Sequence, residues 1–293
     1  IGDIAVERKL NKNFDDFFAK ILLSIGYILS FRTLRKKLGL QRAEFAASGA
    51  APIAPEVLKF FMSIGVPLFE AYGMTENCAY ATSNSPENIK IGTVGIPAHG
   101  VELKLADDGE ILIRSGGVFK GYFKDDQATS ETIDKDGWLH TGDVGIYEGD
   151  FVKIIDRKRD IIITSGGKNV SPSEIENKIK VSPFIKEAIV IGDRRKFLSV
   201  LIGIEFDTVS NWALRKNIPH TTYRDLSEKQ EVKDLVWKEI SRANELTSSL
   251  EVREFRMIPK ELDHEEGELT ATQKVKRNVL IDQFSDLIEE MYS

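Results

Sequence analysis

The stretch FAASGAAPIAPEVLKFFMSIGVPLFEAYGMTE, residues 45–76, decides how the first part of this chain folds. An apolar run at 45–48 enters a turn of small residues, and a second apolar run at 66–72 ends at a glycine. A helix is predicted at 56–64, because Pro55 suits a first helical turn, where backbone N–H groups stay unbonded. Strand, helix and strand in this order predict a mostly parallel, doubly wound sheet of the α/β class.

The residues before this stretch predict a helix over 14–38, since apolar positions are dense and proline is absent. Its apolar part, 21–29, is far shorter than the ~20 residues that a membrane-spanning helix needs. Two interpretations remain. A core helix with a solvated charged end is favoured over a basic amphipathic helix in peripheral contact with a membrane surface. The basic residues that follow the apolar part are Arg32, Arg35, Lys36 and Lys37.

The sequence pattern changes after Gly92. Residues 101–105 alternate apolar and polar side chains, and Asp108-Gly109 is a strong hairpin turn, so a returning strand is predicted at 110–114. Further on, apolar runs at 153–155 and 161–163 flank the charged run 156–160. This pattern indicates strand, charged turn and strand, and we expect a domain boundary there.

The remaining residues predict a compact α+β unit. Ser171-Pro172-Ser173-Glu174 is a capping box with proline at the first helical position, so a helix through Lys180 should follow. The other expected elements are strands at 187–192, 197–206 and 252–258, helices near 208–217 and 227–246, and a last helix at the end of the chain.

Composition excludes some classes of protein and site. The 293 residues have a net charge of −6, which argues against a general nucleic-acid partner, because such proteins need a basic surface. Cys78 is the only cysteine, so no intrachain disulfide and no cysteine-rich zinc site can form. A reducing compartment such as the cytoplasm fits, and no signal peptide is visible. The four histidines lack metal-ligand spacing and are His99, His140, His220 and His264.

Two short segments carry groups suited to a nucleotide. In Tyr72–Glu76, an aromatic ring can stack on a base, a hydroxyl can meet a phosphate, and a carboxylate is the ligand type that Mg²⁺ prefers. In Gly137–Asp143, a turn presents a carboxylate that can accept from both ribose hydroxyls. Each segment by itself is equally well explained as an ordinary loop.

Six segments together resemble, in order and spacing, the motifs of the adenylate-forming (AMP-binding) superfamily, which includes acyl-CoA synthetases, luciferases and peptide-synthetase adenylation domains. They are Ser48–Pro52, Tyr72–Glu76, Gly109–Tyr122, Gly137–Gly145, the run Asp156–Asp160 with Gly166–Asn169 and Glu174–Glu176, and Leu269–Arg277. The resemblance implies that residues 1–156 are the carboxyl-terminal part of the large adenylate-forming domain, a partly parallel sheet plus a small β subdomain. It also implies a small, mobile α+β domain at 157–293, with a hinge around 156–160.

The resemblance implies a role for each matching residue of the large domain. Tyr72 stacks on adenine, Gly73 allows close backbone approach, Thr75 contacts phosphate, and Glu76 helps to hold Mg²⁺. The adenine-side turn consists of Gly49, Ala50, Ala51 and Pro52.

The matching residues near and beyond the hinge have roles by the same resemblance. Asp143 binds the ribose hydroxyls, with Arg157 close to it on the nucleotide, and Arg159 lies at the hinge. Lys274 reaches the acyl carboxylate and the α-phosphate during adenylation. In the thioester step it is replaced by the loop Gly166, Gly167 and Lys168.

Within the superfamily, the wording of two motifs resembles long-chain fatty acyl-CoA synthetases of the bubblegum-like type. These motifs are Gly267–Thr270 ahead of Lys-x-Lys-Arg, and Asp156–Ile161. The resemblance implies a ligase that joins a fatty acid to CoA with ATP through an acyl-adenylate. Ala271 stands where the family usually has proline, which should loosen that loop slightly.

The family's Ser/Thr/Gly-rich phosphate loop ending in Pro-Lys-Gly is not found in this sequence. Its one lookalike, Ser115–Gly121, follows a hairpin strand and does not join a strand to a helix, so we interpret it as structural. The family's earlier half-sheet is also not found. The expected partner is therefore the amino-terminal half of the same enzyme, and Ile1 is expected to lie within a larger domain.

Three hypotheses follow. The first is a fatty acid–CoA ligase whose residues act once the other half is present. The second is a catalytically inactive nucleotide- or partner-binding remnant of such an enzyme. The third, a different adenylate-forming enzyme such as a peptide-synthetase domain, is disfavoured by the wording of the terminal motif.

Overall fold

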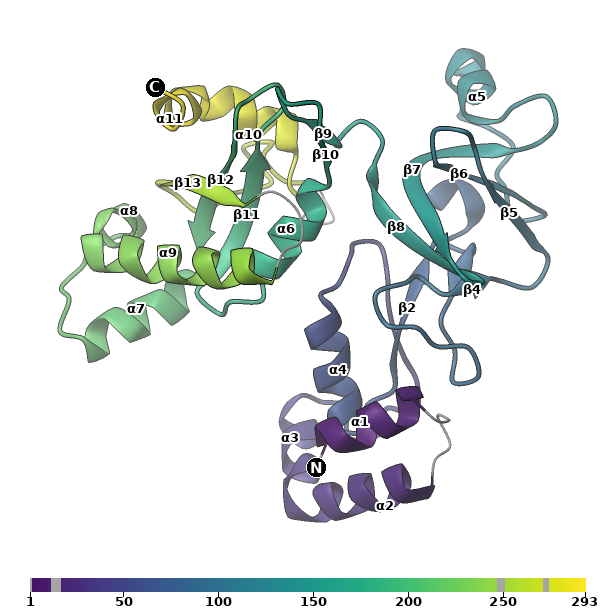
Figure 1. The fold of residues 1–293 in the computed structure, drawn as a ribbon, viewed down its shortest axis with the longest axis horizontal. Helices are drawn as coiled ribbons and strands as arrows, with labels where there is room; N and C mark the ends of the chain where they lie inside the picture. The colour runs from purple at the N-terminus through teal and green to yellow at the C-terminus, as the bar shows by residue number, and fades with distance from the viewer. Residues whose placement is uncertain (1, 12–16, 247–250, 271–273) are drawn as a thin grey trace. The chain divides into compact units, whose positions relative to one another are not determined.

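The structure is a computed structural model that describes residues 2–11, 17–246, 251–270 and 274–293 (Figure 1). The chain divides into two compact units, Ile1–Arg159 and Asp160–Ser293. Each unit has its own sheets and its own buried core, and the mixed helices and strands confirm the α/β class.

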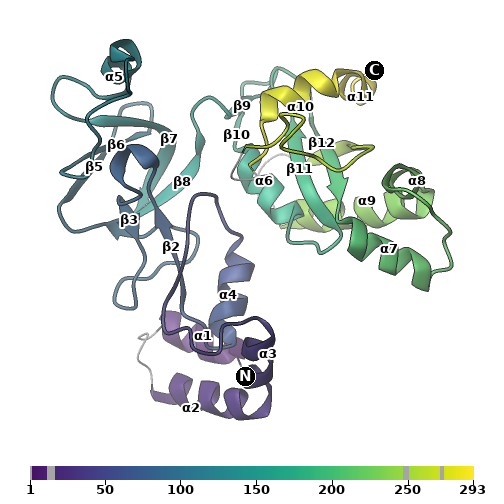
Figure 2. The ribbon, with the colours of Figure 1, turned by 180° about the vertical axis from the view of Figure 1, so that it is seen from behind.

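The first unit begins with helices that gather at one end of it, where α1 packs on both α2 and α4 (Figures 1 and 2). The helix predicted at 14–38 is confirmed over its described part, 17–37, but it contains a π-helical turn. Gly26 leaves room for the Phe31 ring there, since a Cβ on Gly26 would lie 2.2 Å from that ring. The helices of this region are α1 (Gly2–Asn11), α2 (Phe17–Gly26), the π-helix η1 (Tyr27–Phe31), α3 (Arg32–Lys37) and α4 (Pro55–Ser63).

The apolar run within the predicted helix is largely exposed in the described chain. Within the run 21–29, Ile21 is 39% exposed, Ile25 44% and Ile28 81%. None of the described helices combines the length and the low charge that crossing a bilayer requires.

The first sheet has the order β1-β2-β3-β4. β1 and β2 are parallel and in the register Ser48 to Glu70, with α4 as the crossover, as the order of elements predicted. Phe69 of β2 and Leu58 of α4 are each only 2% exposed, so apolar burial holds the helix on the strands. The strands are β1 (Ala46–Ser48), β2 (Leu68–Tyr72), β3 (Thr82–Ser83) and β4 (Ile96–Pro97).

The second sheet is an antiparallel meander in the order β5-β6-β7-β8. The hairpin predicted at Asp108-Gly109 is confirmed, and Gly109 takes a φ of 83° that the turn requires. Ile111, Ile113 and Leu139 are wholly buried beneath this sheet. Its elements are β5 (Val101–Leu105), β6 (Glu110–Ser115), β7 (Leu139–Glu148) and β8 (Phe151–Arg157), with helix α5 (Asp126–Thr132) between β6 and β7.

The charged run at 156–160 is only partly a turn, contrary to the expectation. Asp156 and Arg157 belong to β8, because they pair with Val144 and Asp143 of β7. Backbone pairing with a neighbouring strand outweighs the turn-like composition of these residues. The turn is confined to 158–160.

The second unit is a three-layer structure around the sheet β11-β12-β13. β11 and β12 are antiparallel, β12 and β13 are parallel, and every residue of β12 is buried. Helices α6 to α9 cover one face of the sheet and α10 and α11 the other. The strands are β9 (Ile162–Ile163), β10 (Asn169–Val170), β11 (Ile185–Ile191), β12 (Leu198–Ile204) and β13 (Val252–Met257).

One helix of this unit begins at the predicted capping residue, and one predicted helix is divided into two. The Ser171 hydroxyl accepts a hydrogen bond from the Glu174 N–H at 3.2 Å and so caps α6, as predicted. The helix predicted at 227–246 is interrupted at Lys229, which has an extended ψ of 134°. The helices are α6 (Pro172–Ile179), α7 (Phe206–Arg215), α8 (Tyr223–Glu228), α9 (Gln230–Glu245), α10 (Arg277–Gln283) and α11 (Ser285–Glu290).

The two sheets of the first unit are hydrogen-bonded to each other at Gly95, where there is no room for a side chain. The Val152 N–H donates to the Gly95 carbonyl at 2.8 Å, and a Cβ on Gly95 would lie 1.9 Å from the Ser83 carbonyl carbon. Gly95→Ala should therefore add overpacking of about 1–3 kcal/mol to the cost of a left-handed alanine, roughly 1–2 kcal/mol. The loss in free energy of unfolding is measured by amide hydrogen exchange of the first unit as a function of urea concentration.

Gly100→Ala is the matched control for that substitution. Gly100 has a similar φ of 76°, but no atom lies within 4 Å of its added Cβ. It should show the backbone cost alone, and equal losses for both variants would contradict this account of Gly95.

Candidate functional site

Two turns leave the first sheet at the same edge, because β1 and β2 are parallel. The turn 49–52 follows β1 and the turn 73–76 follows β2. Gly49 allows the backbone of the first turn to lie close to Ala71 of β2, since a Cβ on Gly49 would lie 3.0 Å from the Ala71 carbonyl oxygen. Ala50 takes a φ of 67°, an uncommon conformation for a residue with a side chain. The predicted adenine-side turn and the Tyr72–Glu76 segment therefore emerge side by side.

Gly73 lets the second of these turns fold back on itself. A Cβ on Gly73 would lie 2.3 Å from the carbonyl carbon of Ala79, so only glycine fits without a shift of the backbone. Thr75 and Glu76 lie in the 3₁₀ turn η2 (Thr75–Asn77). The Asn77 side chain is wholly buried and accepts a hydrogen bond from the Met74 N–H at 2.9 Å. This buried amide holds the turn that presents Thr75 and Glu76.

Tyr72 and Asp143 are in direct contact. The Tyr72 hydroxyl donates to Asp143 Oδ2 at 2.6 Å, and the Tyr72 side chain is only 9% exposed. Burial, followed by the charge and the hydrogen bond of Asp143, raises the pKa of Tyr72 far above its usual range. The tyrosine therefore stays protonated and remains a donor to the carboxylate.

Arg157 lies on the strand next to Asp143, which it faces in the register of β7 and β8. Its Nε is 3.8 Å from Asp143 Oδ1, and about half of its side chain is exposed. Tyr72, Asp143 and Arg157 thus come together from three strands.

Glu76 is hydrogen-bonded to Tyr122, a residue for which the sequence analysis predicted no functional role. The Tyr122 hydroxyl donates to Glu76 Oε1 at 2.8 Å, and this hydrogen bond raises the pKa of Tyr122. The Phe119 N–H also donates to the Glu76 carbonyl oxygen at 2.8 Å. The segment Ser115–Gly121, interpreted above as structural, is therefore in direct contact with the Thr75–Asn77 turn. No polar pattern around Tyr122 marks this contact in the sequence.

The residues at this edge fit a magnesium ion only together with a nucleotide. No group of three or more His, Cys, Asp or Glu side chains suited to a metal occurs in the described ranges. Mg²⁺ commonly binds proteins through one or two carboxylates and takes its other ligands from substrate phosphates and water. The carboxylate of Glu76 fits that donor set.

The Gly166–Gly167–Lys168 segment is a tight loop in the second unit, between β9 and β10. Thr164 closes it by donating from its N–H to the Lys168 carbonyl at 3.0 Å and by accepting on its hydroxyl from the Lys168 N–H at 3.2 Å. Gly167 has a φ of 75°, and no atom lies within 4 Å of an added Cβ. The loop is therefore narrow and open to solvent.

Lys274 follows a segment, 271–273, that lies outside the described residues and includes Ala271. The Lys274 N–H donates to the Thr270 hydroxyl at 3.0 Å, and the Thr270 N–H donates to the Lys274 carbonyl at 2.8 Å. Arg277 fastens the other side, with Nη2 donating to Glu176 at 2.6 Å and Nη1 to the Val190 carbonyl at 2.9 Å. The backbone of Lys274 is thus hydrogen-bonded to Thr270, and Arg277 anchors the residues that follow it.

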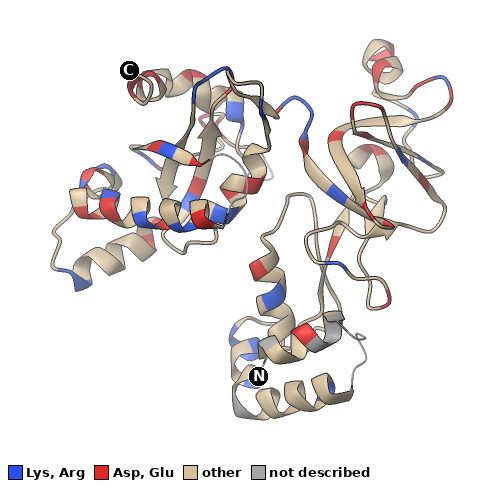
Figure 3. Cartoon of the chain, in the orientation of Figure 1, with Lys and Arg blue, Asp and Glu red and all other residues tan. Residues whose placement is uncertain are grey.

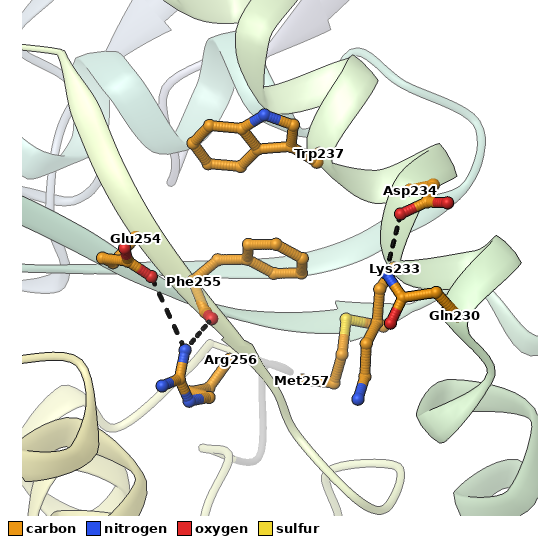
Figure 4. A pocket seen from close by; sticks show the side chains of 8 residues that line it. All are labelled: Gln230, Lys233, Asp234, Trp237, Glu254, Phe255, Arg256 and Met257. Atoms are coloured by element: carbon orange, nitrogen blue, oxygen red, sulfur yellow. Dashed lines mark hydrogen bonds and ion pairs between the residues drawn. The ribbon is translucent and has the colours of Figure 1, made fainter.

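A hollow of about 360 Å³ on the second unit contains none of the predicted site residues (Figure 4). Trp237 of α9 and Phe255 of β13 stack in it with ring centroids 5.7 Å apart. Charges of both signs are interspersed along α9 (Figure 3). The lining residues are Gln230, Lys233, Asp234, Trp237, Glu254, Phe255, Arg256 and Met257.

Two family models match the chain. The model described as AMP-binding enzyme matches residues 17–123, and the model described as AMP-binding enzyme C-terminal domain matches residues 159–293. Together they cover most of both units.

Curated relatives include long-chain fatty acid–CoA ligases. The chain is 37% identical to FadD15 of Mycobacterium bovis over 268 residues, and the match covers 90% of this chain and 44% of that protein. It is 32% identical to ACSBG2 of Gallus gallus over 290 residues, covering 90% of this chain and 38% of that protein. The chain therefore spans less than half the length of these relatives.

Solved structures share the fold. The adenylation domain of the carboxylate reductase from Mycobacterium chelonae matches with a TM-score of 0.69 at 22% identity, covering 99% of this chain and 44% of that chain. ATP-bound MatB from Rhodopseudomonas palustris matches with a TM-score of 0.61 at 24% identity, covering 86% of this chain and 47% of that chain.

Glu70, two residues before Tyr72, predicts a pH dependence of stability. It is 8% exposed, and burial raises its pKa from 4.5 to about 7, while a hydrogen bond from the Ile53 backbone opposes the shift. The folded state thus binds the proton more tightly than the unfolded state. Its stabilising contribution is complete below about pH 4.5 and is lost as the pH rises through about 7.

Glu70→Gln should remove this component, so that urea unfolding of the variant changes less between about pH 5 and 8 than that of the wild type. Glu56→Gln, at an exposed position of α4, is the control. An unchanged pH dependence in Glu70→Gln would show that the Glu70 carboxyl is not the group responsible.

Proposed function

Because this chain belongs to the AMP-binding enzyme family, we propose that it is the carboxyl-terminal part of a long-chain fatty acid–CoA ligase. Its substrates are a fatty acid, ATP and CoA, and its partner is the amino-terminal half of the same enzyme. The supporting observation is that Tyr72, Asp143 and Arg157 converge from segments far apart in the sequence. The long-chain ligases among the relatives support the substrate class.

In the proposed nucleotide site, AMP lies against the edge formed by β1 and β2. The turn 49–52 faces the adenine beside Tyr72, and Asp143 accepts hydrogen bonds from the ribose hydroxyls. Arg157, half-exposed beside Asp143, offers a positive charge to the nucleotide. Thr75 donates its hydroxyl to a phosphate oxygen.

In the first proposed step, a carboxylate oxygen of the fatty acid attacks the α-phosphorus of ATP. The bond from this phosphorus to the bridging oxygen breaks, and pyrophosphate leaves. The Lys274 ammonium is a compact charge that stabilises the negative charge developing on the phosphate oxygens. Glu76 would hold Mg²⁺, which neutralises charge on the leaving pyrophosphate when bound.

In the second proposed step, the CoA thiol loses its proton to solvent, and its sulfur attacks the acyl carbonyl carbon. The bond from this carbon to the phosphate oxygen breaks, and AMP leaves. The Gly166–Gly167 loop takes the place of Lys274 after rotation about the hinge near Arg159. A loop without side chains at two positions leaves room for the narrow pantetheine arm of CoA.

Reconstitution tests the proposed function. The 293-residue chain is combined with a separately produced amino-terminal half of a long-chain ligase such as FadD15, and acyl-CoA formation from ATP, CoA and fatty acids of different lengths is measured. We expect turnover with long chains. Two folded halves that bind each other and yet form no acyl-CoA would contradict the proposal. AMP binding without turnover would favour a nucleotide-binding remnant.

Lys274→Ala in the reconstituted enzyme should separate the two steps. Exchange of pyrophosphate into ATP, which reports adenylation, should fall by roughly 100- to 1000-fold, the usual loss when a group stabilising developing charge is removed. Thioester formation from supplied acyl-adenylate should persist. Lys276→Ala, at an exposed position of the same segment, is the control. Equal losses in both steps would argue against a role confined to adenylation.

A further inference from the structure

The Glu76 carboxylate receives a side-chain hydrogen bond from a separate part of the first unit. Tyr122 donates to its Oε1 at 2.8 Å. Within the ranges that the structure describes, no other side chain donates a hydrogen bond to this carboxylate. The bond engages Oε1 and therefore orients Oε2, the second oxygen of the group.

Tyr122 is itself held by contacts that fix its ring and its backbone. Its ring packs edge to face on Phe119, with centroids 4.9 Å apart and planes at 74°. The Tyr122 N–H donates to the Thr129 hydroxyl at 2.9 Å. Thr129 belongs to α5, which Asp125 caps by accepting from the Ala128 N–H at 2.9 Å.

The backbone at Gly121 lies so close to Thr129 of α5 that only glycine fits there. A Cβ on Gly121 would lie 2.5 Å from Thr129 Cγ2, so the chain reaches Tyr122 only by passing close to α5. Hydrogen bonds thus connect Thr129 of α5 to Tyr122 and connect Tyr122 to Glu76. A carboxylate held in this way keeps its orientation before any ligand binds.

We propose that Tyr122 is a positioning residue that presents one oxygen of Glu76 to the divalent cation of a bound nucleotide. The inference rests on the ligase function proposed above. A hydrogen-bonded partner fixes a ligating carboxylate, and removing such a partner typically weakens metal binding roughly 10- to 100-fold. Tyr122 does not touch the metal or the substrate in this role.

The test uses Mn²⁺ as the probe, because its electron paramagnetic resonance signal reports free and bound ion directly. Mn²⁺ is titrated in the presence of ATP into the 293-residue chain and into the reconstituted enzyme, as wild type and as Tyr122→Phe. We expect Mn²⁺ binding to weaken roughly 10- to 100-fold in the variant. ATP binding without metal should be unchanged, because the substitution acts through the metal-facing carboxylate alone.

Tyr147→Phe is the matched control. Tyr147 is exposed to a similar extent, and its hydroxyl donates to the Leu103 carbonyl at 3.1 Å, away from Glu76. Its loss should leave Mn²⁺ binding within about twofold of wild type. If Tyr122→Phe does not fold, Phe119→Leu removes the ring on which Tyr122 packs and should weaken Mn²⁺ binding in the same direction.

Three other outcomes overturn the inference. Unchanged Mn²⁺ affinity in Tyr122→Phe excludes positioning by Tyr122, and an equal loss of ATP binding with and without metal indicates a purely structural role. Absence of Mn²⁺ binding by both wild-type forms shows that Glu76 holds no cation. Normal Mn²⁺·ATP binding without acyl-CoA formation contradicts the ligase function instead, and the comparison of variants remains valid.

Discussion

The hydrogen bond from the Tyr72 hydroxyl to the Asp143 carboxylate is the interaction on which the candidate site depends. It joins the end of β2 in one sheet to β7 in the other, at 2.6 Å and largely away from water. A charge-assisted hydrogen bond is strong in such surroundings. Arg157 is placed in turn by strand pairing with Asp143. The ring, the carboxylate and the guanidinium therefore keep one mutual geometry as long as this bond is intact.

Local sequence signals predicted elements in both units. The Asp108-Gly109 turn and the Ser171 cap are each fixed by contacts within a few residues, so the sequence carries enough information to predict them. The interruption at Lys229 was not predicted, because the helical pattern on both of its sides is continuous. The extension of β8 through Arg157 was also missed, since its cause is pairing with a strand that turns back along it.

The candidate site illustrates the same limit. Tyr72, Glu76 and Asp143 were expected from motifs, each with a role toward a ligand, but the bond between Tyr72 and Asp143 joins residues 71 positions apart. The contact between Tyr122 and Glu76 spans 46 positions. A tyrosine in a loop has no spacing that reveals its partner, so only the fold identifies such contacts.

Both candidate functional segments of the second unit are hydrogen-bonded to β11 or to the turn that follows it. Arg277, three residues after Lys274, donates to the Val190 carbonyl of β11. The Gly166–Lys168 loop is tied to the turn after β11, where the Ser165 N–H donates to the Arg195 carbonyl at 3.0 Å and the Arg194 N–H to the Ile163 carbonyl at 2.8 Å. The closely packed core on both faces of the sheet resists any relative shift of these attachments. Neither segment can change its place independently without breaking these bonds. The exchange of Lys274 for the glycine loop that we propose would therefore move the second unit as one body.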